Sequence, residues 1–113
     1  MPSLVLKPDL ELTHDHRSDA LGVLCCGALA FVFSSLAHEA IGHGGAALLA
    51  GEKITLLTSV FFNASDAQPI TDAAGPIMNF LVAGFCILLL RRNRPASSHG
   101  KLLVTALAAV NLF

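Results

Sequence analysis

The chain has 113 residues, of which 54% are hydrophobic and only 13% are charged. Soluble globular proteins carry about 25% charged residues, so the composition indicates an integral membrane protein rather than a soluble domain. The formal net charge of −1, without basic runs between aromatic residues, argues against a nucleic-acid partner.

Residues 1–19 are polar and acidic, and we expect a loose N-terminal arm there. A signal peptide is not expected, because its charged region would be short and positive. Residues 20–50 are mostly apolar, and about 20 such residues suffice to cross a bilayer as a helix. We therefore predict one long membrane helix over residues 20–50.

Three polar side chains interrupt this apolar stretch, in the sequence His38-Glu39-Ala40-Ile41-Gly42-His43. Imidazoles and a carboxylate are costly to remove from water, so their presence there indicates a function. Two neutral imidazoles can bind Zn²⁺, and a neighbouring carboxylate can take a proton from the water on the metal. The segment therefore predicts His38 and His43 as metal ligands and Glu39 as a general base.

The spacing of the two histidines allows two interpretations. In the common H-E-x-x-H pattern the histidines are four apart and share a helical face, whereas His38 and His43 are five apart. Five steps of about 100° would separate the rings on a regular helix. A π-bulge, eased by Gly42, would bring them back together, and we favour this interpretation. Alternatively, a regular helix would direct Glu39 and His43 to the metal together and His38 elsewhere.

Residues 52–68 are rich in β-branched and aromatic side chains and contain a turn signal at Asn63–Asp66. They predict one strand or a short hairpin. Because open strand edges are unstable in lipid, we expect this β element at the membrane interface or against protein.

A second apolar run, residues 73–90, predicts a second full span. Gly75 and Pro76 would lie in its first turn, where proline is tolerated. Asn79 would lie one turn further along, on the same side as Gly75. These three residues are candidates for orienting a substrate or for packing helices together.

The strongest basic cluster follows in residues 91–101, so this loop and the N-terminus are expected on the cytoplasmic side. Residues 102–113 are apolar but too few to cross a bilayer, and we expect a partial third span. The predicted class is thus mainly α, a helical membrane protein with two full spans, a partial third span and a β element between the first two. We expect the chain to be a fragment or a truncated product.

The motif from His38 to His43, with the small residues that follow it, resembles the first motif of site-2 protease-type intramembrane zinc metalloproteases. The segment Ala74-Gly75-Pro76-Ile77-Met78-Asn79-Phe80 resembles the glycine-proline-x-x-asparagine segment of the same family. The resemblance covers about residues 35–90. It implies a Zn²⁺ site with His38 and His43 as ligands and Glu39 as general base, acting on membrane-protein substrates in a lipid membrane, with the bacterial cytoplasmic membrane as the expected location.

Two features depart from that family. With its extra residue between the histidines, the motif resembles the H-E-x-x-x-H form of the soluble TldD/PmbA-type metallopeptidases more closely. The apolar setting and the Gly75-Pro76 segment do not fit that soluble family. The family's third ligand, an Asp on a later transmembrane helix, has no counterpart, since Asp66 and Asp72 come too early. Alternative functions are a non-catalytic membrane scaffold, or a metal or proton transport component that uses His38, Glu39 and His43.

Overall fold

The computed structural model describes residues 9–113, with side chains from Asp19 onward, and 74% of the chain is helical. A small two-stranded sheet is the other regular element. In chain order the elements are α1 (Asp9–Leu36), the π-helix η1 (Ala37–Gly44), α2 (Gly45–Ala50), β1 (Lys53–Leu57), β2 (Phe62–Ser65), α3 (Pro69–Arg91) and α4 (Ser98–Leu112).

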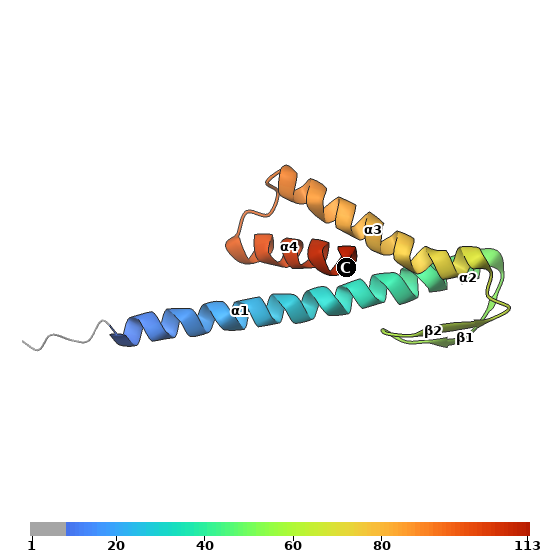
Figure 1. The fold of residues 1–113 in the computed structure, drawn as a ribbon, viewed down its shortest axis with the longest axis horizontal. Coiled ribbons are helices and arrows are strands. Elements are labelled where there is room, and N and C mark those ends of the chain that lie inside the picture. The colour runs from blue at the N-terminus through green and yellow to red at the C-terminus, as the bar shows by residue number, and fades with distance from the viewer. Residues whose placement is uncertain (1–8) are drawn as a thin grey trace, which may run out of the picture.

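α1, η1 and α2 form one uninterrupted helical rod, which Figure 1 shows along the length of the molecule. The long helix predicted over residues 20–50 is present, and it ends where Gly51 adopts a left-handed conformation with φ of 73°. It begins at Asp9, so a loose arm over the whole of residues 1–19 is wrong for its second half. Residues 1–8 lie outside the described part of the chain.

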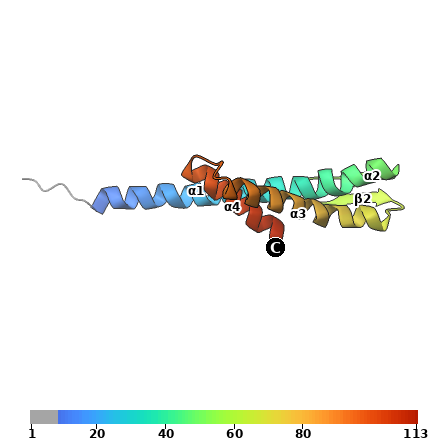
Figure 2. The same ribbon diagram turned by 90° about the horizontal axis from the view of Figure 1, so that it is seen from above.

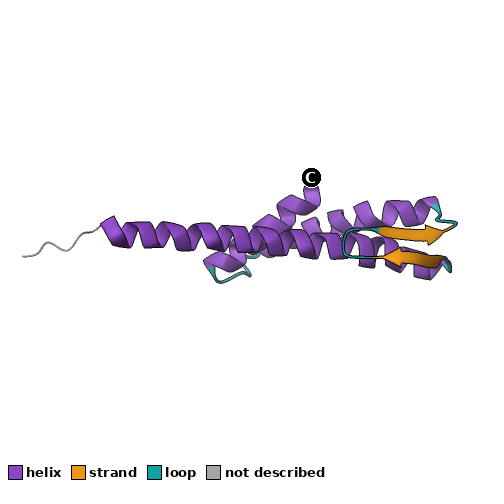
Figure 3. Ribbon diagram, turned by 90° about the horizontal axis from the view of Figure 1, so that it is seen from below, coloured by secondary structure: helices purple, strands orange, loops and turns teal. Residues whose placement is uncertain are grey.

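The β element is a hairpin, the second of the two forms that the sequence allowed. β1 and β2 pair antiparallel, with Lys53 opposite Ser65 and Leu57 opposite Phe62, and the register shifts between Ile54 and Leu56. Figure 3 shows the hairpin folded back beside the rod rather than extended away from it. It therefore brings β2 close to the π-helical segment.

α3 starts earlier than the sequence predicted. Pro69 occupies its first turn, so Pro76 lies inside the helix and not in the first turn as expected. Proline is favoured at the first helical position because its missing N–H has no partner to lose there, and Pro69 meets that condition. Pro76, in contrast, has no N–H to give to the carbonyl of Asp72 four residues earlier. The predicted basic loop is also shorter, because Ser97 caps α4 by accepting a hydrogen bond from the Gly100 N–H.

α3 crosses the rod at η1, and the two then diverge, with α4 packed between them (Figures 1 and 2). Ser34 on α1 donates a hydrogen bond of 3.0 Å to Oδ1 of Asn111 on α4, and both side chains are buried. The Asn111 amide in turn donates to the Leu107 carbonyl at 2.8 Å. A polar link between distant parts of the sequence thus fixes the end of α4 against α1.

The distribution of apolar side chains is the reverse of that in a soluble core. From Asp19 onward, where side chains are described, every buried hydrophobic residue is an alanine or a cysteine: Cys26, Ala30, Ala47, Ala83, Cys86 and Ala108. Large residues point outward instead, among them Leu24 (70% exposed), Phe80 (64%) and Phe85 (61%). Two helical stretches, Asp19–Ala50 and Pro69–Arg91, are long and apolar enough to cross a membrane. Small residues at helix contacts and large apolar ones outside are typical of helices packed in lipid.

We predict a measurable coupling across the Ser34–Asn111 hydrogen bond. A double-mutant cycle with Ser34→Ala and Asn111→Ala should give a coupling energy of about 0.5–1.5 kcal/mol, because interhelical hydrogen bonds in membranes have that strength. The measurement is unfolding by SDS from mixed micelles. Thr105→Ala is the control, since Thr105 donates only to the Lys101 carbonyl of its own helix. Strictly additive effects would contradict the assigned bond.

Candidate metal centre

The two motif histidines converge because the helix that carries them is a π-helix. η1 spans Ala37–Gly44 and contains both rings. Its i→i+5 hydrogen bonds widen the turn, so side chains five positions apart share a face. His38 Nε2 lies 3.1 Å from His43 Nε2, and the ring centroids are 4.8 Å apart in an edge-to-face arrangement. The π-bulge predicted from the spacing is confirmed, and the regular-helix alternative is wrong.

The hydrogen bonding of His43 assigns its protons. Nδ1 lies 2.7 Å from the carbonyl oxygen of Thr71, which can only accept, so Nδ1 carries the hydrogen. In the neutral ring Nε2 then has a free lone pair, and it is this atom that faces His38. A histidine whose second nitrogen donates to a backbone carbonyl is the usual arrangement of a metal ligand.

The separation of the two Nε2 atoms fits a shared metal ion. Two imidazoles bound to tetrahedral Zn²⁺ at about 2.0–2.1 Å would hold their nitrogens about 3.3 Å apart. The observed 3.1 Å is close to that value. The same distance also accommodates a hydrogen bond from a protonated His38 Nε2 to His43 Nε2. Measuring the metal content of the purified protein would distinguish a metal-bound pair from a hydrogen-bonded pair.

Glycines allow α3 to come this close to the rings. A Cβ added to Gly75 would lie 2.3 Å from His43 Nε2 and 2.6 Å from His38 Nε2, in the space that the two nitrogens share. A Cβ on Gly42 would lie 2.7 Å from the Gly75 Cα atom. Both glycines are buried, and they face each other where η1 and α3 cross. Close backbone approach between small residues is a common way for membrane helices to pack.

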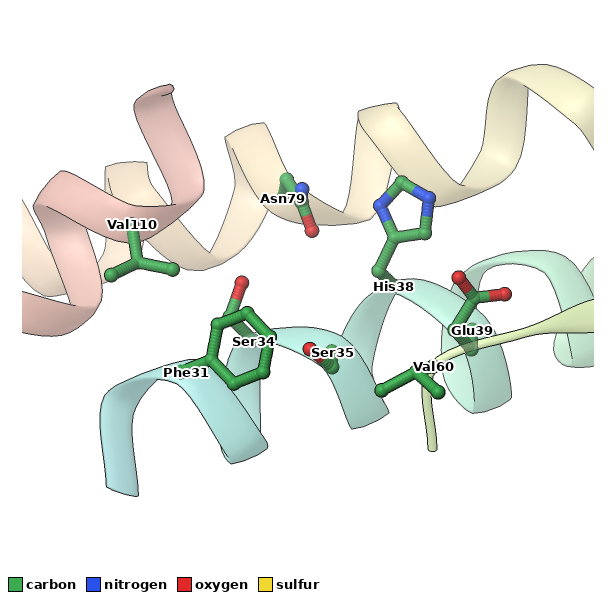
Figure 4. A pocket seen from close by; sticks show the side chains of 8 residues that line it. All are labelled: Phe31, Ser34, Ser35, His38, Glu39, Val60, Asn79 and Val110. Atoms are coloured by element: carbon green, nitrogen blue, oxygen red, sulfur yellow. The ribbon is translucent and has the colours of Figure 1, made fainter. Parts of the chain in front are cut away.

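A cavity of about 290 Å³ opens beside His38, and Glu39 and Asn79 line it together with Ser34, Ser35, Phe31, Val60 and Val110. In Figure 4, His38 and Ser34 extend toward α3 while Asn79 extends toward them, and Glu39 stands beside His38. Oδ1 of Asn79 is buried and has no hydrogen-bond partner among the described residues. A second hollow of about 180 Å³, lined by His38, Pro76 and Asn79, lies toward the end of α4. The predicted site residues therefore gather around His38.

Two residues that hold His43 were not identified from the sequence. Thr71 supplies the carbonyl for Nδ1, and Phe62 of β2 stacks on the ring with centroids 5.4 Å apart and 15° between the planes. Thr71 could have been found, since it precedes Gly75 by four residues and Asn79 by eight, on one face of α3. Nothing local marks Phe62, because only the folding of the hairpin brings it to the ring.

A third protein ligand is not found in the described part of the chain, where no group of three His, Cys, Asp or Glu side chains gathers around a possible metal position. Comparisons with protein-family models, with curated proteins and with solved structures gave no match to this chain. Any functional conclusion therefore depends on the geometry of the histidine pair and its surroundings.

We predict that Gly75→Ala disrupts the site. The added methyl group would overlap both ring nitrogens, so the rings or α3 must move, at a cost of about 1–3 kcal/mol in the free energy of unfolding. The measurement is SDS unfolding with imidazole ¹⁵N NMR of the two histidines. Gly84→Ala is the matched control on the same helix, where nothing lies within 4 Å of the added Cβ. Equal stability of the two variants would contradict the close crossing.

Proposed function

We propose that the chain is an integral membrane protein in which α1–η1–α2 and α3 cross the bilayer. Their length and hydropathy support this proposal, as do the large apolar side chains on the outside of both helices. Lipid would cover these side chains, and removing them from water contributes about 25 cal/mol for each Å² of apolar surface. The hairpin would then lie near one membrane surface, with its edges against η1 or in the interface.

We propose further that the histidine pair binds Zn²⁺ and that the protein is an intramembrane metalloprotease of the site-2 protease type. The observation that carries the proposal is the approach of two Nε2 atoms to 3.1 Å on a π-turn of an apolar helix. π-bulges are frequent at functional sites, and ionisable groups within membrane helices usually have a function. Glu39 between the ligands in sequence and the Gly75–Asn79 segment beside them agree with the resemblance.

In the proposed reaction the chain's own residues perform three tasks. His38 and His43 hold the ion, which when bound supplies Lewis acidity toward a peptide carbonyl and toward water. Glu39 would accept the proton of the attacking water and return it to the leaving amine. The unpartnered Oδ1 of Asn79 would accept a hydrogen bond from a backbone N–H of an extended substrate.

The ligand set that these residues supply is a pair. Tetrahedral zinc in hydrolases has three protein ligands and one position for water or substrate. The resemblance assigns the third position to an Asp on another transmembrane helix, and the described residues do not supply it. We therefore propose proteolysis only for a form of the protein in which a further carboxylate, from another transmembrane helix, binds the same zinc ion as His38 and His43.

Purified protein is expected to contain zinc that depends on both histidines. His38→Ala and His43→Ala should each lose the metal, because a single imidazole holds Zn²⁺ weakly, whereas His99→Ala, far from the pair, should retain it. Mass-spectrometric metal analysis after detergent purification gives the answer. An absence of zinc from wild type and variants alike, even after loading, would favour the membrane scaffold.

Replacement of Glu39 should separate metal binding from catalysis. Glu39→Gln is expected to keep its zinc and, in a form that also has the further carboxylate ligand, to lower cleavage of co-expressed, tagged single-span membrane proteins by about 10²–10⁴-fold, the usual contribution of a general base. Asp66→Asn, in the exposed turn after β2, is the control. Zinc binding without cleavage in wild type, together with Glu39-dependent movement of metal or protons into vesicles, would instead support the transport alternative.

A further inference from the structure

The carbonyl and the hydroxyl of Thr71 both form hydrogen bonds with residues of the segment 43–52. Its carbonyl accepts from His43 Nδ1–H at 2.7 Å, and its hydroxyl donates to Oε1 of Glu52 at 2.7 Å. Thr71 is fully buried, with 0% of its surface exposed. The position of the His43 ring and the position of the Glu52 carboxylate are thus connected through a single residue of α3.

The turn at the C-terminal end of α2 positions Glu52 for its contact with Thr71. Gly51 turns the chain in its left-handed conformation, and the Glu52 N–H bonds back to the Ala47 carbonyl at 2.9 Å. The carboxylate then reaches the start of α3, where Oε1 also accepts from the Gln68 N–H at 3.0 Å. Gln68 is the N-cap residue and makes no side-chain cap, and Glu52 accepts from its backbone N–H as the glutamate of a capping box does, but from outside the helix.

We propose that Glu52 is a positioning residue for His43. By accepting from Thr71 and Gln68, the carboxylate fixes the first turn of α3 and so the direction of the Thr71 carbonyl. That carbonyl keeps the hydrogen of His43 on Nδ1 and the lone pair of Nε2 toward His38. The effect on metal affinity rests on the proposed function, while the effect on the ring does not.

Two physical features favour a hydrogen-bond acceptor at position 52, where Oε1 of Glu52 makes both contacts and Oε2 is buried without a partner among the described residues. The N-terminal end of a helix carries partial positive charge, and a negative group there is stabilised. A buried threonine hydroxyl and a free N–H also need an acceptor, since an unpaired buried polar group is costly. Groups that orient a metal-binding histidine through its second nitrogen commonly change metal affinity 10–100-fold when removed.

The experiment uses the whole chain in detergent micelles and two readouts. Imidazole ¹⁵N NMR of the metal-free protein reports the tautomer of His43, and competition with a chromophoric chelator reports affinity for Zn²⁺ alone. Glu52→Ala is expected to convert a single Nδ1–H tautomer into a mixture and to weaken zinc binding about 10–100-fold. Glu52→Gln, which still offers a carbonyl oxygen to Thr71 and Gln68, should restore the tautomer. Asp66→Ala is the control acidic replacement.

Thr71→Val provides an independent variant if Glu52→Ala unfolds. It removes the hydroxyl but keeps the carbonyl and the Glu52–Gln68 contact, so a smaller shift in the same direction is expected. An unchanged tautomer in both Glu52→Ala and Thr71→Val would overturn the inference, even if both variants bind zinc.

The two readouts distinguish a failure of the proposed zinc site from a failure of the positioning role of Glu52. Wild type that binds no zinc, combined with a tautomer that changes in Glu52→Ala, would reject the metal site and retain the positioning role. Wild type that binds zinc as tightly as Glu52→Ala, with the same tautomer in both, would retain the metal site and reject the positioning role.

Discussion

The close crossing of η1 and α3 is the constraint on which the remaining contacts depend. At Gly42 and Gly75 two backbones meet with no side chain between them, and the rings of His38 and His43 lie directly beside this contact. A larger residue at either glycine would separate the helices. The Thr71 carbonyl would then move out of reach of His43, and Asn79 would move away from the cavity beside His38. Van der Waals contact between small residues thus sets the geometry of the polar groups.

Three parts of the fold contribute to the site: the rod, α3 and the hairpin. The rod supplies the histidines and Glu39, and α3 supplies the carbonyl of Thr71, the open space at Gly75 and the amide of Asn79. The hairpin adds the stacked ring of Phe62. His43 is therefore held by Phe62 on one face and by Thr71 at Nδ1, and its Nε2 is directed at Nε2 of His38. Such fixed orientation lowers the entropic cost of binding a metal at the Nε2 atom of His43.

Local sequence features were sufficient for the elements and for the histidine pair. The apolar runs marked the two long helices, and the five-residue spacing of His38 and His43 required a π-turn if the rings were to meet. The start of α3 was placed too late, because the acceptor that stabilises its first turn, Glu52, comes from another element. Pro76 was consequently expected in the first turn of the helix, where Pro69 lies instead. Phe62 could not be found from local sequence features, since its contact with His43 exists only after the hairpin has folded, whereas Thr71 shares a helical face with Gly75 and Asn79.

The π-turn takes up the additional residue between the histidines, so the rod beyond it keeps nearly the rotational phase of a regular helix that is one residue shorter. Each residue of an α-helix advances the direction of its side chain by about 100°. A chain shortened by one residue at Ala40 would restore a regular four-residue interval between the imidazoles. Because the widened turn of five residues and a regular interval of four each complete about one turn, the Gly51 reversal and the hairpin would keep their direction relative to α3. The widened turn therefore lets the interval between the imidazoles change by one residue without changing the orientation of the β-hairpin at the end of the rod.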